Sequence, residues 1–168
     1  MTAQADPNTP DRLGPWIDAL RHRLDRVRPE AAIAGQLLVE QLTAVATGDI
    51  EAVCASLAPD VVVDVWGVVP GGHWSWHGSS ARDALTAWSA AAPVPVTSGR
   101  VDIDRFFPGG DEIGFDGDLS WLNAGAGATA LVQRRIGVFA TYRDGLLAEL
   151  VVYVDVHEAV DVARRAAQ

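Results

Sequence analysis

The sequence has little of the material that several classes of protein need. Its one cysteine, Cys54, allows no internal disulfide and no cysteine-based metal cluster. No apolar run approaches the roughly 18 residues that a membrane-spanning helix requires. The polar segment 1–10, which contains two prolines, lacks the basic start and apolar centre of a signal peptide. These absences predict a cytoplasmic protein that does not enter the membrane.

Basic residues are also few relative to acidic ones. The chain has 13 Lys and Arg against 22 Asp and Glu, which gives a formal net charge of −9. We therefore expect no nucleic-acid partner, because the phosphate backbone is bound by surfaces rich in positive charge. What the chain has instead is an ordinary globular composition, with 49% hydrophobic residues over 168 positions. That length suits one domain with a sizeable core.

The chain divides into tails, an added helix and one main domain. Residues 1–10 are expected to be a disordered tail and residues 161–168 a C-terminal tail. Between 11 and 28, apolar residues recur at helical spacing, with arginines and His22 on the opposite face. This segment is predicted to be an amphipathic helix that docks on its own domain or on a partner subunit. The main domain is expected to span 29–160.

Helices precede long strands along the main domain. Helical patterns cover 30–47, 50–57 and 81–91, and two short strands are expected at 61–66 and 73–77. Four longer strands are expected at 96–107, 111–121, 129–142 and 146–157, joined by glycine-rich turns. Helices followed by a meander of antiparallel strands predict an α+β architecture.

Several local motifs, in this order, resemble a known superfamily. The segments GDIEA at 48–52 and LAPDV at 57–61 are similar to one of its motifs. Trp76-His77-Gly78 before a helix, and the segment from Asp144 to Asp155, are similar to two others. Over about 30–160 the chain resembles the nuclear transport factor 2-like superfamily, in its SnoaL-like branch. The resemblance implies a cone-shaped fold of three to four N-terminal helices on a curved, mainly antiparallel six-stranded sheet, and a homodimer.

This superfamily includes isomerases, cyclases, dehydratases, epoxide hydrolases and non-catalytic binders, so the fold alone leaves the activity open. Where ketosteroid isomerases place a tyrosine and two aspartates, this chain has Gln41, Val65 and Gly137. Steroid-type isomerisation is therefore disfavoured, although a shift of one residue restores Asp64.

Epoxide hydrolases of the limonene type are a second comparison. Residues 153–158 resemble their closing strand at Tyr153, Asp155 and Glu158, but the region 115–119 lacks their arginine. SnoaL-like polyketide cyclases, which use an acid on a late strand together with histidine, are the closest functional class that the resemblance implies.

Alternation along the last strand yields the favoured catalytic acid. Tyr153, Asp155 and His157 share one strand face, and the intervening valines share the other. A carboxylate that lines an apolar cavity has its pKa raised by desolvation towards the range useful for acid–base catalysis. Asp155 is therefore the preferred acid, with Tyr153 and His157 as pocket residues. The alternative for His157 is solvent exposure at the end of the strand.

Further candidates lie on the earlier strands. Alternation puts His73 and His77 on one face, where either could act as an acid or base. A metal site is not expected there, because no third ligand is evident. Asp64 and Asp118 are the other candidate catalytic carboxylates, and Arg135 could pair with an acid or bind an anionic group. The candidate pocket tryptophans, which suit a flat polycyclic or aromatic ligand, are Trp66, Trp76, Trp88 and Trp121.

The sequence thus predicts an enzyme without a cofactor that acts on a small hydrophobic substrate, such as a polyketide, terpenoid or steroid. Carboxylate acid–base chemistry would drive a cyclisation or isomerisation. One alternative is a non-catalytic ligand-binding or dimerisation module, which the loss of several family catalytic positions favours. The other is an epoxide hydrolase, which requires Arg135 to lie near Asp118 or Asp155.

Overall fold

A computed structural model describes residues 14–67, 72–90, 96–125 and 128–154. Its helices are α1 (Gly14–Leu24), α2 (Ile33–Thr47), α3 (Ile50–Ala55) and α4 (Ser79–Ala90), with a 3-10 turn at Pro29–Ala31. Its strands are β1 (Leu57–Trp66), β2 (His73–His77), β3 (Val96–Pro108), β4 (Glu112–Gly125), β5 (Ala128–Arg143) and β6 (Leu146–Val154). None of the described helices is long and apolar enough to cross a membrane.

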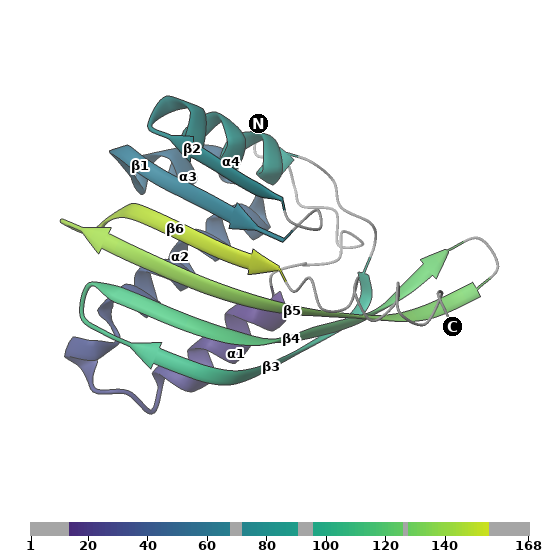
Figure 1. The fold of residues 1–168 in the computed structure, drawn as a ribbon. Helices are drawn as coiled ribbons and strands as arrows, with labels where there is room; N and C mark the ends of the chain where they lie inside the picture. The colour runs from purple at the N-terminus through teal and green to yellow at the C-terminus, as the bar shows by residue number, and fades with distance from the viewer. Residues whose placement is uncertain (1–13, 68–71, 91–95, 126–127, 155–168) are drawn as a thin grey trace, which may run out of the picture.

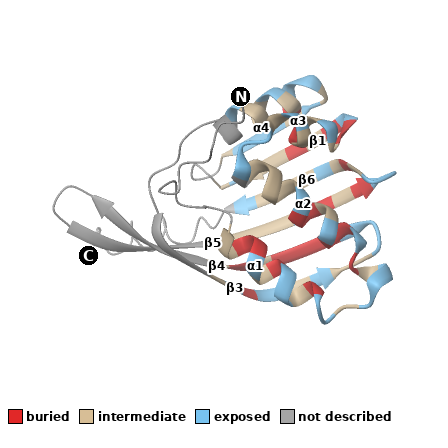
Figure 2. Ribbon diagram, turned by 180° about the vertical axis from the view of Figure 1, so that it is seen from behind, coloured by how far each residue is buried: buried red, intermediate tan, exposed pale blue. Residues whose placement is uncertain are grey.

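The strands form one open sheet in the order β2-β1-β6-β5-β4-β3. Only the central β1–β6 pair is parallel among the described strands, and the other neighbours run antiparallel. The described helices lie behind the sheet in Figure 1 and in front of it in Figure 2, so they cover one face. The opposite face, which none of the described helices covers, is called the uncovered face below. The predicted α+β class and the mainly antiparallel pairing are confirmed.

Two neighbouring residues separate α2 from α3, as the sequence predicts. Gly48 adopts a left-handed φ of 70°, which ends α2 and which a residue with a Cβ adopts only at a cost. Asp49 then caps α3, because its Oδ1 accepts a hydrogen bond from the backbone N–H of Ala52 at 3.0 Å. These two residues thus join α2 to α3, which packs against α2 and α4.

The prediction that the third helix runs to residue 57 is wrong. α3 ends at Ala55, and β1 already begins at Leu57. The backbone N–H of Leu147 donates to the carbonyl of Ser56 at 2.9 Å, which draws the chain into the sheet directly after the helix. Pro59 has no N–H to donate to a neighbouring strand. It lies where the register between β1 and β6 shifts, and the irregular pairing there accommodates the missing donor.

The added N-terminal helix packs on its own domain. α1 buries Trp16, Ile17, Leu20 and Leu24 against α2 and β3. The two helices approach closely at Gly35 of α2, where an added Cβ would lie 2.4 Å from a methyl carbon of Leu24. Of the two docking alternatives that the sequence left open, the described residues thus show contact with the domain itself.

The core lies between the helices and the covered face of the sheet. Trp16 of α1 meets Phe115 of β4 with ring centroids 5.5 Å apart, and Val61, Ile113 and Leu147 are among the residues buried around them. In Figure 2 these buried segments follow the helix-covered face. The uncovered face instead exposes large aromatic side chains by 41–55%: Trp66, Phe107, Phe139 and Tyr153.

Candidate functional site

The pairing of β1 with β2 gathers polar side chains on the uncovered face. Asp64 lies directly opposite Ser75 in the antiparallel register, with His73 and His77 two residues to either side of Ser75. Because side chains alternate along a strand, these three β2 residues and Asp64 project to the same face. The alternation that the sequence predicted for the two histidines is what places them around one carboxylate.

Hydrogen bonds link these four side chains. His73 Nε2 lies 3.1 Å from Asp64 Oδ1, and Ser75 Oγ lies 3.2 Å from His77 Nε2. The hydroxyl of Ser75 also donates to Asp64, and this bond, together with His73, holds the pKa of Asp64 below its usual value despite desolvation by burial. Asp64 is therefore ionised at neutral pH. Since a carboxylate only accepts, His73 Nε2 carries the proton of that bond.

Aromatic rings extend from this cluster across the sheet. The indole of Trp66 stacks on the imidazole of His73, with centroids 3.7 Å apart and an interplanar angle of 11°. Tyr153 of β6 lies nearly parallel to Trp66 at 6.3 Å, and Phe139 of β5 meets Tyr153 edge-on at 6.3 Å. An added Cβ at Gly114 would lie 2.6 Å from the Phe139 ring, so this glycine leaves space for it.

A second cluster on the same face surrounds Arg135. Its Nη1 lies 2.7 Å from Asp104 Oδ2 and 3.3 Å from Asp118 Oδ2, and its Nη2 lies 2.7 Å from Asp116 Oδ1. Arg105 also pairs with Asp116. Burial raises the pKa of Asp116, but the hydrogen bonds and charges of the two arginines outweigh it and hold that pKa below its usual value.

The position of Arg135 speaks against the epoxide-hydrolase alternative. The arginine does lie beside Asp118, as that alternative requires. However, Gly137 pairs with both Tyr153 and Asp116, which places the arginine cluster on the uncovered face, and the Arg135 side chain is 35% exposed. An arginine that points away from the helices does not line a cavity between the helices and the sheet.

Among the other predicted pocket residues, the structure describes the side chain of Trp76. Trp76 packs partly against the core, on the sheet face opposite to Trp66. The side chains of Trp88 and Trp121 lie outside the described residues, as do Asp155 and His157. Within the described ranges, no three His, Cys, Asp or Glu side chains are grouped so that they could hold a metal ion.

Phe139 was not identified from the sequence, although the signal for it is present. Arg135, Gly137 and Phe139 are spaced two residues apart along β5, so they lie on the same face of the strand. What the sequence does not state is which face the helices leave uncovered, and an apolar residue on an unknown face is ordinarily assigned to the core.

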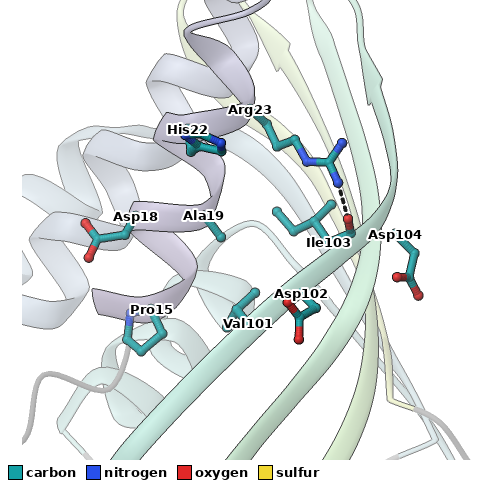
Figure 3. A pocket seen from close by; sticks show the side chains of 9 residues that line it. All are labelled: Pro15, Asp18, Ala19, His22, Arg23, Val101, Asp102, Ile103 and Asp104. Atoms are coloured by element: carbon teal, nitrogen blue, oxygen red, sulfur yellow. Dashed lines mark hydrogen bonds between the residues drawn. The ribbon is translucent and has the colours of Figure 1, made fainter.

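A groove of about 580 Å³ opens at the edge of the sheet, between α1 and β3 (Figure 3). Its lining comes from Pro15, Asp18, Ala19, His22 and Arg23 on the helix and from residues 101–104 on the strand. Arg23 spans the groove and donates to the carbonyl of Ile103. None of the candidate site residues predicted from the sequence lines it.

Comparison with known proteins places the fold. No protein-family model and no curated protein sequence match the chain. Solved structures do match it. One, assigned as a SnoaL-like polyketide cyclase from Jannaschia sp. CCS1, is 12% identical, with a TM-score of 0.55 over 80% of this chain and 93% of that one. Another such assigned cyclase, from Shewanella denitrificans OS-217, is 16% identical, with a TM-score of 0.53 over 82% and 99%.

An epoxide hydrolase of the limonene type from M. tuberculosis is also similar, at 19% identity and a TM-score of 0.52 over 79% of this chain and 90% of that chain. Identities this low establish a shared fold and not a shared activity. The chain therefore has the nuclear transport factor 2-like fold, as the order of its sequence motifs indicated.

Proposed function

We propose that the chain is an enzyme that moves a proton on a small hydrophobic substrate, with Asp64 and His73 as its acid–base pair. The observation that carries the proposal is the 3.1 Å contact between His73 Nε2 and the ionised carboxylate of Asp64. The imidazole ring of His73 is also stacked against the indole of Trp66. With its Nε2 proton committed to Asp64, the neutral imidazole has its lone pair on Nδ1, where it can accept a substrate proton. Asp64 then stabilises the imidazolium that forms.

The adjacent rings favour a flat substrate. Trp66 and Tyr153 lie nearly parallel and partly exposed, so together they offer a surface on which a ring system of a polyketide, terpenoid or steroid can stack. Removal of a proton next to a carbonyl in such a substrate leads to an isomerisation or a ring closure. Asp155, the acid that the sequence favoured, stays a prediction for the same strand face as Tyr153.

A hydrogen-exchange assay tests this proposal without knowledge of the natural substrate. The protein is incubated in D₂O with α-tetralone, a flat bicyclic ketone, and deuterium uptake next to the carbonyl is followed by NMR against a protein-free sample. We expect His73→Gln and Asp64→Asn to lower the protein-dependent rate by about 100-fold, within the range typical of general-base catalysis. The matched control, Asp83→Asn at an exposed position of α4, should leave the rate unchanged. Equal rates in all four proteins would contradict the proposal.

A non-catalytic dimerisation module is the second candidate. The observation that favours it is the set of exposed aromatic side chains on the uncovered face, because large apolar patches on monomers commonly mark contact surfaces. Sedimentation velocity over a range of protein concentrations tests it. A monomer throughout the micromolar range would contradict this candidate and leave the acid–base proposal standing.

A further inference from the structure

The groove between α1 and β3 follows a free edge of the sheet. β3 is the last strand in the sheet order, so among the described strands only β4 pairs with it. Residues 101–104 of β3 line the groove on one side, and α1 lines it on the other (Figure 3). A strand edge that faces a helix across a groove can receive an extended peptide as a further strand of the sheet.

Two residues of β3 direct backbone groups out of the sheet towards this groove. The carbonyl of Ile103 accepts a hydrogen bond from the side chain of Arg23 on α1, which lies outside the sheet. Because successive residues of a strand direct their N–H and C=O groups to opposite edges, Val101 presents both groups on the same side as Ile103. The side chains of these two residues point towards α1 and form an apolar strip. An added strand thus finds hydrogen-bonding groups with an apolar surface beside them.

Positive charge at the C-terminal end of α1 determines which peptides fit. Arg23 lines the groove. Arg26 adjoins it, because its Nη2 lies 3.0 Å from Nε2 of His22, another lining residue. Within the described ranges, neither arginine forms an ion pair with a carboxylate. These two guanidinium groups therefore favour an occupant that carries carboxylates of its own.

The aspartates around the groove do not cancel this charge. In Figure 3 the carboxylates of Asp102 and Asp104 lie on the side of β3 away from α1, and Asp104 is paired with Arg135. Asp18 points away from β3. The molecule as a whole, with a formal net charge of −9, repels acidic peptides. A preference for an acidic peptide over a neutral one must therefore come from the local arginines.

We propose that the groove binds an extended acidic segment of a partner protein, which adds to the edge of β3 as a further strand. A peptide N–H replaces Arg23 as the donor to the Ile103 carbonyl. The released guanidinium then binds a carboxylate of the peptide together with Arg26. In the free protein, Arg23 thus occupies the edge and protects it from unspecific strand pairing. The site is separate from Asp64 and His73 and does not depend on the acid–base proposal.

Fluorescence anisotropy with labelled peptides tests strand addition in the wild-type protein. The acidic probe alternates valine with threonine and carries aspartate at both ends, and its neutral analogue carries asparagine there. We expect the acidic probe to bind about 10-fold more tightly, the effect of one charge-assisted hydrogen bond. N-methylation at alternate residues should abolish binding in only one of the two possible series, since a strand directs every second N–H to one neighbour. Equal binding of the acidic and neutral probes, or equal effects of the two methylated series, would overturn the proposal.

Variants of α1 separate the two roles of the arginines. Arg26→Gln should remove most of the preference for the acidic probe, whereas Arg21→Gln, outside the groove, should leave it unchanged. Arg23→Met should increase the affinity for the neutral probe about 5-fold, because the Ile103 carbonyl no longer has a competing donor. A weaker or unchanged affinity for the neutral probe in Arg23→Met would contradict the displacement step.

A proline on the edge itself locates the binding. Val101→Pro removes an outward N–H, and proline is tolerated on edge strands, so this variant should fold but bind neither probe. If it does not fold, the methylated peptides still test strand addition in the wild type. Sedimentation velocity covers the alternative occupant, a second copy of the chain. Self-association that Val101→Pro abolishes, in a wild type that binds no peptide, would assign the edge to that second copy and refute the proposal.

Discussion

At the scale of single residues, two glycines of the sheet differ sharply in what surrounds them. An added Cβ at Gly117 would lie 2.4 Å from the carbonyl oxygen of Asp102 and 2.9 Å from the Cα of Ile103, both backbone atoms of β3. At Gly137 the nearest atoms would be 3.7–3.9 Å away, which is ordinary contact. The backbone of β3 thus lies so close to Gly117 that there is no room for a side chain at this position.

We expect Gly117→Ala to lower the free energy of unfolding by about 1–3 kcal/mol, the usual effect of overpacking, because the backbone of β3 must move. Gly137→Ala is the matched control and should be neutral or slightly stabilising, since alanine loses less backbone entropy than glycine. Urea denaturation measures both. Similar unfolding midpoints for the two variants would show that β3 moves freely.

Tyr142 is a buried residue whose ionisation is coupled to stability. Its hydroxyl donates to Gln41 Oε1 at 2.6 Å, and burial, followed by the charge of Glu40, raises the pKa of Tyr142 above its ordinary value. As the pH rises past about 10, the unfolded chain loses this proton first. The stabilisation is therefore complete below that pH and is lost as the pH climbs towards the folded-state pKa.

Tyr142→Phe should lower stability at neutral pH by about 1–3 kcal/mol, because Gln41 loses a hydrogen-bond donor. The same variant should flatten the alkaline loss of stability, and Glu40→Gln should flatten it in part. Thermal unfolding between neutral pH and pH 11 measures the slopes. An alkaline slope that is equally steep in the wild type and Tyr142→Phe would contradict this assignment.

From the sequence, alternation predicts which residues of one strand share a face, but not which residues of two different strands do. His73 and His77 are placed together correctly, because their spacing alone decides that they share a face. Trp66 and Trp76 were assigned to one pocket but lie on opposite faces. Their relation depends on the register between β1 and β2, and a shift of one residue exchanges the faces without any change in spacing.

At the scale of elements, Arg135 ties three neighbouring strands together. It pairs with Asp116 and Asp118 of β4 and with Asp104 of β3, where the register with β4 shifts. The sequence identified Arg135 as a residue that could pair with an acid. The convergence of three carboxylates on it could not be predicted, because the irregularity that turns Asp104 towards it leaves no periodic signal.

Arg135→Gln should leave these carboxylates to repel one another across β3 and β4. We expect its stability to rise with salt, because screening weakens repulsion between exposed charges, whereas the wild type should gain less. The difference is measured from urea unfolding midpoints at about 20 mM and about 500 mM NaCl. These concentrations lie below and above the roughly 0.1 M salt at which the Debye length is about 10 Å. Arg143→Gln, which removes only the pair with Asp60, is the control. Equal salt responses in both variants would contradict this account.

Element order and type were readable from the sequence for a physical reason. Gly48, Asp49 and the loop glycine Gly145, with a φ of 77°, act through local backbone geometry that does not depend on the rest of the fold. The early start of β1 was missed, because it depends on the hydrogen bond from Leu147, a residue far along the chain. Long-range pairing overrides local preference there.

At the scale of the whole molecule, the uncovered face is where the predicted homodimer would form. Phe139 is 47% exposed on this face, and Ile33 is 49% exposed at the start of α2. We expect Phe139→Glu to weaken dimerisation at least 10-fold, because a carboxylate would have to be desolvated in the contact. Ile33→Glu should have no effect. Sedimentation velocity measures dimerisation of both variants. Weaker dimerisation in Ile33→Glu alone would show that the dimer contact lies on the helical side of the sheet instead.

The parallel β1–β6 pair can form only late in synthesis of the chain. β1 obtains its outer neighbour β2 early in synthesis, but Leu57 and Val65 pair with Leu147 and Val152, which are translated much later. The inner edge of β1 thus stays without its partner strand while most of the chain is made. Pairings this distant along the chain slow folding, because a long loop must close before they form. In the nascent chain this edge of β1 is therefore open to pairing with other strands until β6 has been made.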